Sequence, residues 1–385
     1  YQLAKYNDNQ CFVSLEERMA CGGAGSCLGC SIPMNYGKIK YLCQDGPFFN
    51  AAEVDWLELL KRDKPAKCLI KAKQTKRTPE KDKFRTVITG MSGNMLVLNN
   101  PFMIASGCDN LASESRHIDL TQAGAVITKG IRLEERAGNK GHRVAETPCG
   151  MINSIGLAGK GLKRFIKEDL PSWQKLNIPV IANISGSTPD EYAKLAFELF
   201  GIEIKILEIN VSCPNLNSCI IGKSPELTGY VCYAVRKAAP KAFLIVKLPP
   251  ADNAISVAKV AIDTGADAVT LINTIPATDV DLETLRPVVG NNYGGLSGEA
   301  IYPVGLEKVS SMKWQFPQLP IFGAGGIINW EIALKYFAYG ASAIQVGTGA
   351  FTDPEILIKI RYGIEQYMLR KGFSHISQIK VEDFK

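Results

Sequence analysis

The sequence predicts an α/β protein built as a closed (β/α)8 TIM barrel with a small cysteine-rich module at its N-terminus. Three observations lead to this prediction. Short apolar, β-branched runs recur eight times, stretches with helical apolar spacing lie between most of them, and polar or glycine residues come directly after the runs. The chain of 385 residues has room for a barrel, which typically takes about 250 residues, and for a small additional domain.

The region before the barrel divides into a module and a linker. Residues 1–60 contain a cluster of four cysteines, and residues 61–86 contain eleven Lys and Arg against three acidic residues. The basic run includes two prolines and no nucleic-acid-binding motif, so a solvated linker explains it more simply than a site for nucleic acid or an acidic partner. The barrel is therefore predicted to occupy residues 87–385.

The barrel region is predicted to open with a β-hairpin formed by Val87–Gly90 and Met95–Leu98. The eight runs that follow are nearly continuous in apolar residues, as expected for parallel strands buried on both faces. Helical spacing is clearest in residues 190–200, 254–264 and 330–339. Eight such units favour a closed barrel over a doubly wound sheet. The runs are Phe102–Ser106, Ala125–Lys129, Val180–Ser185, Ile206–Ser212, Phe243–Leu248, Ala268–Thr274, Ile321–Gly325 and Ile344–Gly347.

Composition excludes several classes of protein. No uninterrupted apolar run is long enough to cross a bilayer, and no charged start precedes an apolar stretch, so we expect a soluble, cytoplasmic protein. The eleven cysteines are unevenly placed, which argues for a metal or cluster site rather than a disulfide framework. No G-x-G-x-x-G follows a strand, so a dinucleotide-binding domain is not evident.

Two glycine-rich loops and one lysine predict a phosphate-bearing cofactor. Gly323–Gly326 lies at the end of the seventh run and Gly347–Gly349 at the end of the eighth, where barrels frequently bind phosphate through the backbone N–H groups of loops. Lys247 lies at the end of a buried strand, and a lysine is rarely buried without a partner. The anionic N1/O2 edge of a reduced flavin would be such a partner; a carboxylate of the protein is the alternative.

Several post-strand motifs together resemble the class 1 dihydroorotate dehydrogenases. The resemblance runs from about Val87 to the C-terminus, in the order of that family. Residues 153–157 resemble its substrate loop, and residues 105–107 and 128–129 resemble its early flavin contacts. The remaining motifs are Asn210–Asn215, Val246–Pro250, Leu271–Thr274, Gly294–Gly298 and the paired glycine loops.

The resemblance implies that dihydroorotate is oxidised to orotate in de novo pyrimidine biosynthesis, with FMN at the mouth of the barrel. It implies that Cys213 is the base that removes the C5 proton while hydride leaves C6 for flavin N5. A cysteine suits this role because its pKa of about 8.5 lies near working pH; a small buried hydrophobe is the alternative. Serine at position 213 would instead resemble the membrane-linked class.

The resemblance also assigns residues to substrate and cofactor, and it implies a homo-oligomer formed through the barrel. Amide side chains suit a pyrimidine ring because each offers both donors and an acceptor. The implied substrate residues are Asn153, Asn210, Asn215, Asn273, Thr274 and Lys129. The implied FMN residues are Ala105, Ser106, Gly107, Lys129, Lys247, Gly298, Gly325, Gly326, Gly347 and Thr348.

The cysteine cluster comprises Cys21, Cys27, Cys30 and Cys43, with a spacing similar to that of plant-type ferredoxins except for one extra residue in the first gap. Structural zinc is the main alternative, and the extra residue leaves the cluster type open. The surrounding sequence resembles the end of the electron-transfer subunit of class 1B dihydroorotate dehydrogenases. This implies a [2Fe–2S] cluster between FMN and an FAD that reduces NAD+. Because the chain begins at Tyr1, we expect an upstream segment or separate subunit to supply FAD and NAD+.

Two other functions fit parts of the pattern. A dihydropyrimidine dehydrogenase-like reductase shares an FMN barrel and a cysteine acid, but it carries [4Fe–4S] modules with a different cysteine pattern. A non-catalytic phosphate-binding barrel with a zinc module and a basic tether is the alternative from another class, and such a protein would be colourless.

Overall fold

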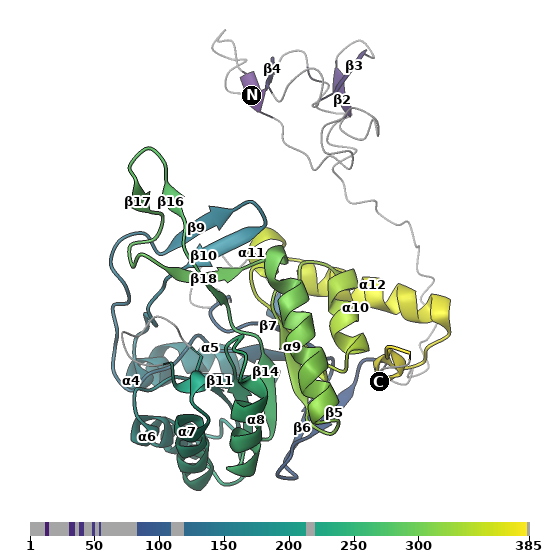
Figure 1. Ribbon diagram of the computed structural model, residues 1–385. Coiled ribbons are helices and arrows are strands. Elements are labelled where there is room, and N and C mark those ends of the chain that lie inside the picture. The colour runs from purple at the N-terminus through teal and green to yellow at the C-terminus, as the bar shows by residue number, and fades with distance from the viewer. Residues whose placement is uncertain are drawn as a thin grey trace. The chain divides into compact units, whose positions relative to one another are not determined.

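The computed structural model describes residues 83–108, 119–212 and 220–382, together with five short segments of the first 82 residues. The chain separates into two compact units, Tyr1–Thr78 and Pro79–Lys385, each of which is described by itself (Figure 1). The boundary between the units falls inside the predicted linker. The bounds proposed from the sequence, at residues 60, 61, 86 and 87, stay predictions.

The described part of the first unit consists of short antiparallel pairs. Strand β1 (Phe12–Ser14) pairs with β4 (Phe48–Asn50), and β2 (Ser31–Met34) pairs with β3 (Lys38–Tyr41). Met34 forms an isolated bridge with Val54, and both side chains are buried. The four cysteines of the predicted cluster lie outside the described residues.

The second unit contains the closed, all-parallel barrel of eight strands that the sequence predicts, and the fold class is confirmed. Seven of these strands lie within a predicted run, whereas β20 begins at Ala343, one residue before its run. All eight strands end earlier than their runs, because the last residues of the runs leave the ladder to form loops. The strands, in barrel order, are β7 (Phe102–Ile104), β8 (Ala125–Ile127), β11 (Val180–Ile184), β12 (Ile206–Asn210), β13 (Phe243–Lys247), β14 (Ala268–Leu271), β19 (Ile321–Ala324) and β20 (Ala343–Val346).

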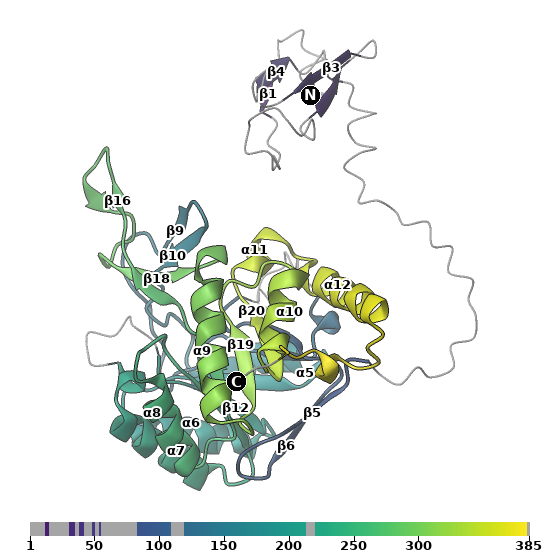
Figure 2. The ribbon, with the colours of Figure 1, turned by 45° about the vertical axis from the view of Figure 1, so that its right-hand side comes forward.

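Helices cover the outside of the barrel, and α6, α7 and α8 lie side by side in both views (Figures 1 and 2). Their starts follow sequence rules: Thr188 and Ser224 accept a backbone N–H at the first turns of α6 and α7, and a proline occupies the start of each helix. The main helices are α6 (Pro189–Gly201), α7 (Pro225–Ala238), α8 (Ala254–Asp263), α9 (Tyr302–Gln315), α10 (Trp330–Ala338) and α12 (Ile356–Lys371).

Shorter helical segments connect these elements. The chain between β10 and β11 forms α4 (Leu162–Arg164), a π-helical turn (Phe165–Asp169) and α5 (Leu170–Gln174), and α11 (Gly349–Thr352) follows β20. Single 3-10 turns are formed by Leu120–Gln122, Ile221–Lys223, Glu299–Ile301 and Ile376–Gln378. Across the ranges that the structure describes, no helix is long and apolar enough to cross a membrane.

A hairpin closes the amino ends of the barrel strands. Strands β5 (Thr86–Thr89) and β6 (Met95–Leu98) pair antiparallel at the position where the sequence predicts a hairpin. Ile88, Leu96 and Leu98 are buried in one apolar cluster with barrel residues such as Phe243. Because this end is filled with packed side chains, the space for a ligand lies at the carboxyl ends of the strands.

A four-stranded antiparallel sheet lies at the opposite end, over the carboxyl ends of the barrel strands (Figure 1). Its order is β15 (Ile275–Ala277), β18 (Gly294–Ser297), β10 (Gly150–Asn153) and β9 (Val144–Thr147). A small hairpin of β16 (Val280–Asp281) and β17 (Arg286–Pro287) extends beyond it. The sequence did not predict this sheet, which brings Asn153 and Ser297 to the mouth of the barrel.

Candidate active site

A pocket of about 310 Å³ opens at the carboxyl ends of the barrel strands. Its volume lies at the lower end of the range for small-molecule and cofactor sites, roughly 300–1,000 Å³. Every predicted substrate or cofactor residue within the described ranges lines it: Ala105, Ser106, Gly107, Lys129, Asn153, Asn210, Lys247, Asn273, Thr274, Gly298, Gly325, Gly326, Gly347 and Thr348. Cys213 and Asn215 lie outside the described residues, and all assigned roles stay predictions.

The loop after β19 requires glycine for its shape. Gly325 and Gly326 have φ angles of +117° and +68°, a region that residues with a Cβ rarely adopt. A Cβ on Gly326 would also lie 2.6 Å from the backbone nitrogen of Tyr302. Tyr336 holds the loop from below, because its hydroxyl donates to the carbonyl of Gly325 at 2.7 Å. Burial raises the pKa of Tyr336, so the hydroxyl keeps its proton and remains a donor.

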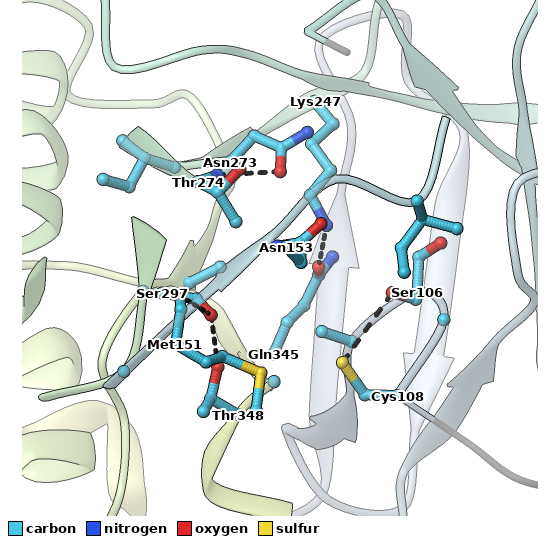
Figure 3. A pocket seen from close by; sticks show the side chains of 18 of the residues that line it. Ser106, Cys108, Met151, Asn153, Lys247, Asn273, Thr274, Ser297, Gln345 and Thr348 are labelled. Atoms are coloured by element: carbon cyan, nitrogen blue, oxygen red, sulfur yellow. Dashed lines mark hydrogen bonds between the residues drawn. The ribbon is translucent and has the colours of Figure 1, made fainter. Parts of the chain in front are cut away.

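The loop after β20 forms the neighbouring wall. The Thr348 hydroxyl donates to Ser297 Oγ at 2.7 Å, which ties this loop to strand β18 of the overlying sheet (Figure 3). Gly107 follows β7, the strand beside β20, and has a φ of +76°, a region that residues with a Cβ rarely adopt. The two glycine loops and the segment after β7 therefore form a continuous part of the pocket wall.

Lys247 lies on the floor of the pocket with only 6% of its surface exposed. Its Nζ donates to Gln345 Oε1 at 3.2 Å (Figure 3). The same Nζ lies 3.6 Å from Glu208 Oε1. The carboxylate partner considered from the sequence therefore exists, and it is Glu208. Lys247 lines the pocket all the same, so its ammonium can also meet a ligand.

Three amide side chains reach the pocket from three elements, and each is held by the protein. Asn153 in β10 donates to the carbonyl of Gly295 at 3.1 Å. Asn210 at the end of β12 accepts the Ser212 hydroxyl at 3.0 Å. Asn273, after β14, donates to the same hydroxyl at 2.7 Å and accepts the backbone N–H of Thr274. An amide fixed in this way keeps remaining donor and acceptor capacity for a ligand in a known orientation.

Comparison with protein-family models identifies both parts of the chain. Residues 91–368 match the model described as dihydroorotate dehydrogenase. The chain belongs to the dihydroorotate dehydrogenase family. Residues 16–55 match the iron-sulfur cluster binding domain of dihydroorotate dehydrogenase B, and this range contains all four clustered cysteines. The family resemblance stated from the sequence is confirmed for both parts.

Curated relatives agree with this assignment. The chain is 41% identical over 291 residues to the dihydroorotate dehydrogenase B (NAD(+)) catalytic subunit of Trichlorobacter lovleyi, a match that covers 74% of this chain and 94% of the relative. The catalytic subunit of the same name from Caldicellulosiruptor saccharolyticus is 40% identical over 288 residues, covering 73% of this chain and 94% of the relative.

A solved structure supports the fold of this dihydroorotate dehydrogenase family member. The crystal structure of DHODH in complex with ferulenol from Eimeria tenella superimposes with a TM-score of 0.64 at 20% identity. The superposition covers 78% of this chain and 89% of that one. At this level of identity the likeness shows the barrel architecture.

One group of polar residues was missed by the sequence analysis. Glu208 is fully buried beneath the pocket and accepts hydrogen bonds from Asn183 at 2.7 Å, Thr270 at 2.9 Å and Gln345 at 2.6 Å. A signal was available in the sequence, since each of these four polar residues has apolar residues directly before and after it in its strand. Of the four, Gln345 alone lines the pocket directly.

Proposed function

We propose that this chain oxidises dihydroorotate to orotate in de novo pyrimidine biosynthesis, with FMN bound in the pocket and electrons leaving through the N-terminal iron–sulfur domain. One observation carries the proposal. Glycine loops suited to phosphate, a buried lysine and three fixed amides all line one pocket in a chain of the dihydroorotate dehydrogenase family.

The pocket residues fit FMN. Gly325, Gly326 and Gly347 line the pocket, and the positive φ angles of Gly325 and Gly326 give their loop a shape in which backbone N–H groups could face a phosphate. Lys247 has three donors, of which one is directed to Gln345, and its charge suits the N1/O2 edge of the isoalloxazine ring. Ala105, Ser106, Gly107, Lys129, Gly298 and Thr348 would complete the FMN contacts. When bound, FMN supplies the acceptor for the two electrons of the oxidation.

The amides would bind and orient the substrate. Asn153, Asn210 and Asn273, with Thr274 and Lys129, can hold the carboxylate and amide edges of dihydroorotate, and Asn215 would join them from its loop. Cys213 follows Ser212 directly in the chain, and we propose that its thiolate takes the C5 proton while C6 loses hydride. The electron pair left at C5 forms the C5–C6 double bond of orotate, so the substrate loses one proton from C5 and, from C6, one hydride that carries two electrons.

The N-terminal domain would carry the electrons onward. We propose that Cys21, Cys27, Cys30 and Cys43 hold a [2Fe–2S] cluster, because the matched family domain binds an iron–sulfur cluster and the spacing is close to the ferredoxin pattern. The relatives are described as NAD(+)-linked catalytic subunits. An FAD/NAD-binding module, on a further segment or a separate subunit, would therefore be the partner that receives the electrons.

An anaerobic absorbance titration tests the proposal. The purified chain is recorded before and after the addition of dihydroorotate, and the flavin band is expected to bleach while the broader cluster absorbance remains or is partly reduced. A flavin that stays oxidised with dihydroorotate but bleaches with dihydrouracil would favour a dihydropyrimidine dehydrogenase-like activity. A protein that is colourless and takes up no added FMN would contradict the proposal.

A further inference from the structure

A layer of buried polar side chains lies directly beneath the floor of the pocket. Strands β11, β12, β14 and β20 each contribute one polar side chain to this layer, and all four side chains are at most 1% exposed. These residues are Asn183, Glu208, Thr270 and Gln345. At the amino end of the barrel the corresponding interior is apolar, with Ile245 and Phe322 among its residues.

Glu208 is the centre of this layer. Its Oε1 accepts from Asn183 Nδ2 and lies 3.6 Å from Lys247 Nζ, and its Oε2 accepts from Thr270 and Gln345. A buried carboxylate is costly unless it is paired and hydrogen-bonded, and replacement of a buried ion pair by apolar residues is often neutral or stabilising. Burial and pairing alone therefore do not explain why a charged residue occupies this position.

The layer meets the pocket at two side chains. Lys247 and Gln345 line the pocket, whereas Glu208 does not. The amide nitrogen of Gln345 donates to Glu208, so its oxygen is left to accept from Lys247 at 3.2 Å. Glu208 thus fixes both the orientation of the Gln345 amide and the place of the Lys247 ammonium. It also puts a negative charge behind the positive charge that faces the pocket.

We propose that Glu208 is a positioning residue whose carboxylate holds Lys247 and Gln345 under the bound FMN and lowers the reduction potential of that FMN. The inference rests on the proposed function, in which FMN occupies this pocket. A cation near N1/O2 stabilises the negative charge of the reduced ring, and a carboxylate behind the cation weakens that effect. A flavin that takes electrons from a donor and passes them to an acceptor needs a reduction potential between those of the donor and the acceptor. Glu208, which lies beneath the pocket, adjusts the potential of the flavin.

The test is the midpoint potential of FMN in the full chain, measured by anaerobic reductive titration at the flavin band. Glu208→Gln removes the negative charge with little change in shape. The potential is expected to rise, because the Lys247 charge is no longer offset, and reoxidation of the flavin through the iron–sulfur domain is expected to slow. Lys247→Met is expected to shift the potential in the opposite direction.

Asp267→Asn is the matched control. Asp267 is also fully buried and is paired with Arg236 at 2.7 Å, but it lies at the amino end of the barrel and does not line the pocket. This substitution is expected to lower stability and leave the potential unchanged. A purely structural role for Glu208 predicts the same pattern for both variants.

Where Glu208→Gln does not retain FMN, Glu208→Asp replaces it. Aspartate keeps the negative charge, but its side chain is one methylene shorter, so the carboxylate lies farther from Lys247. A smaller rise in the FMN midpoint potential is therefore expected. An unchanged potential in whichever of these variants holds FMN overturns the inference. The proposed function fails separately, if the wild-type chain binds no FMN or its flavin is not reduced by dihydroorotate.

Discussion

The two ends of the barrel each contain a fully buried carboxylate, and the two carboxylates have different surroundings. Asp267, just before β14, accepts from Arg236, the backbone N–H of Leu244 and Ser92 of the closing hairpin. Glu208, in β12, accepts from three side chains and lies beside Lys247. Both sites satisfy the charge completely, so burial and pairing alone do not distinguish them.

The two ion pairs differ in the further contacts that the cation of each pair makes. Arg236 donates onward to backbone carbonyls of Gly265 and Ala242, so the amino-end pair joins α7 to the strands. Lys247 instead lines the pocket. The same kind of buried ion pair thus stabilises the fold at one end and faces a ligand site at the other. Substitutions at each end should separate effects on stability from effects on chemistry.

The largest expected effect on chemistry is at Cys213. Cys213→Ala should retain FMN and lower turnover about 10²- to 10⁴-fold, as expected for removal of a general base. Steady-state oxidation of dihydroorotate, with FMN content measured on the same sample, checks this. Cys232→Ala is the control, because Cys232 is fully buried in α7 and burial raises its pKa to about 12. Near-full activity in Cys213→Ala would remove Cys213 as the base.

The largest expected effect on stability lies at the amino end. Asp267→Asn leaves Arg236 without its carboxylate and is expected to reduce the free energy of unfolding by about 3–5 kcal/mol, as for other broken buried pairs. Denaturant unfolding measures this change, and turnover per FMN-loaded molecule should not change. A fall in turnover with intact stability would contradict the separation between the two ends.

Much of the fold could be predicted because the barrel strands are local apolar runs. Strands such as β12 and β13 are buried on both faces, so their pattern is visible in sequence without knowledge of their neighbours. The sheet over the pocket was not predictable in this way. Strands β9 and β18 are short, partly exposed or glycine-rich, and Met151 of β10 pairs with Ser297, far along the chain.

The site was predictable to the extent that its residues follow strands. Asn273, Gly325 and Thr348 were found from their place after apolar runs and from the family motifs. The Glu208 layer was missed because a single polar residue within an apolar run does not reveal its partners. Glu208 and Gln345 are 137 positions apart in the sequence, and they come into contact only because the strands close into a barrel.

Two glycines with positive φ, Gly326 in the loop after β19 and Gly93 in the hairpin at the amino end of the barrel, allow a comparison of backbone strain at the two ends of the barrel. Gly326→Ala forces a Cβ onto a residue with positive φ beside Tyr302, and is expected to weaken FMN binding about tenfold or more. Gly93→Ala, in the closing hairpin, has a similar φ of +86° but no atom within 4 Å of its Cβ, and should cost stability alone. Equilibrium binding of FMN to each apoprotein measures the contrast. Equal FMN affinities in the two variants would show that the loop does not cradle the phosphate.

The smallest expected effects come from two buried tyrosines that should separate cofactor from substrate. Tyr336 donates to the carbonyl of Gly325 at 2.7 Å, and Tyr192 donates to the carbonyl of Asn210 at 2.8 Å. Loss of one neutral hydrogen bond changes an equilibrium roughly three- to tenfold. Tyr336→Phe should therefore weaken FMN binding by this factor, and Tyr192→Phe should instead raise the KM for dihydroorotate. If both variants change the same constant, the glycine loop and the amide group are parts of one coupled site rather than two separate supports.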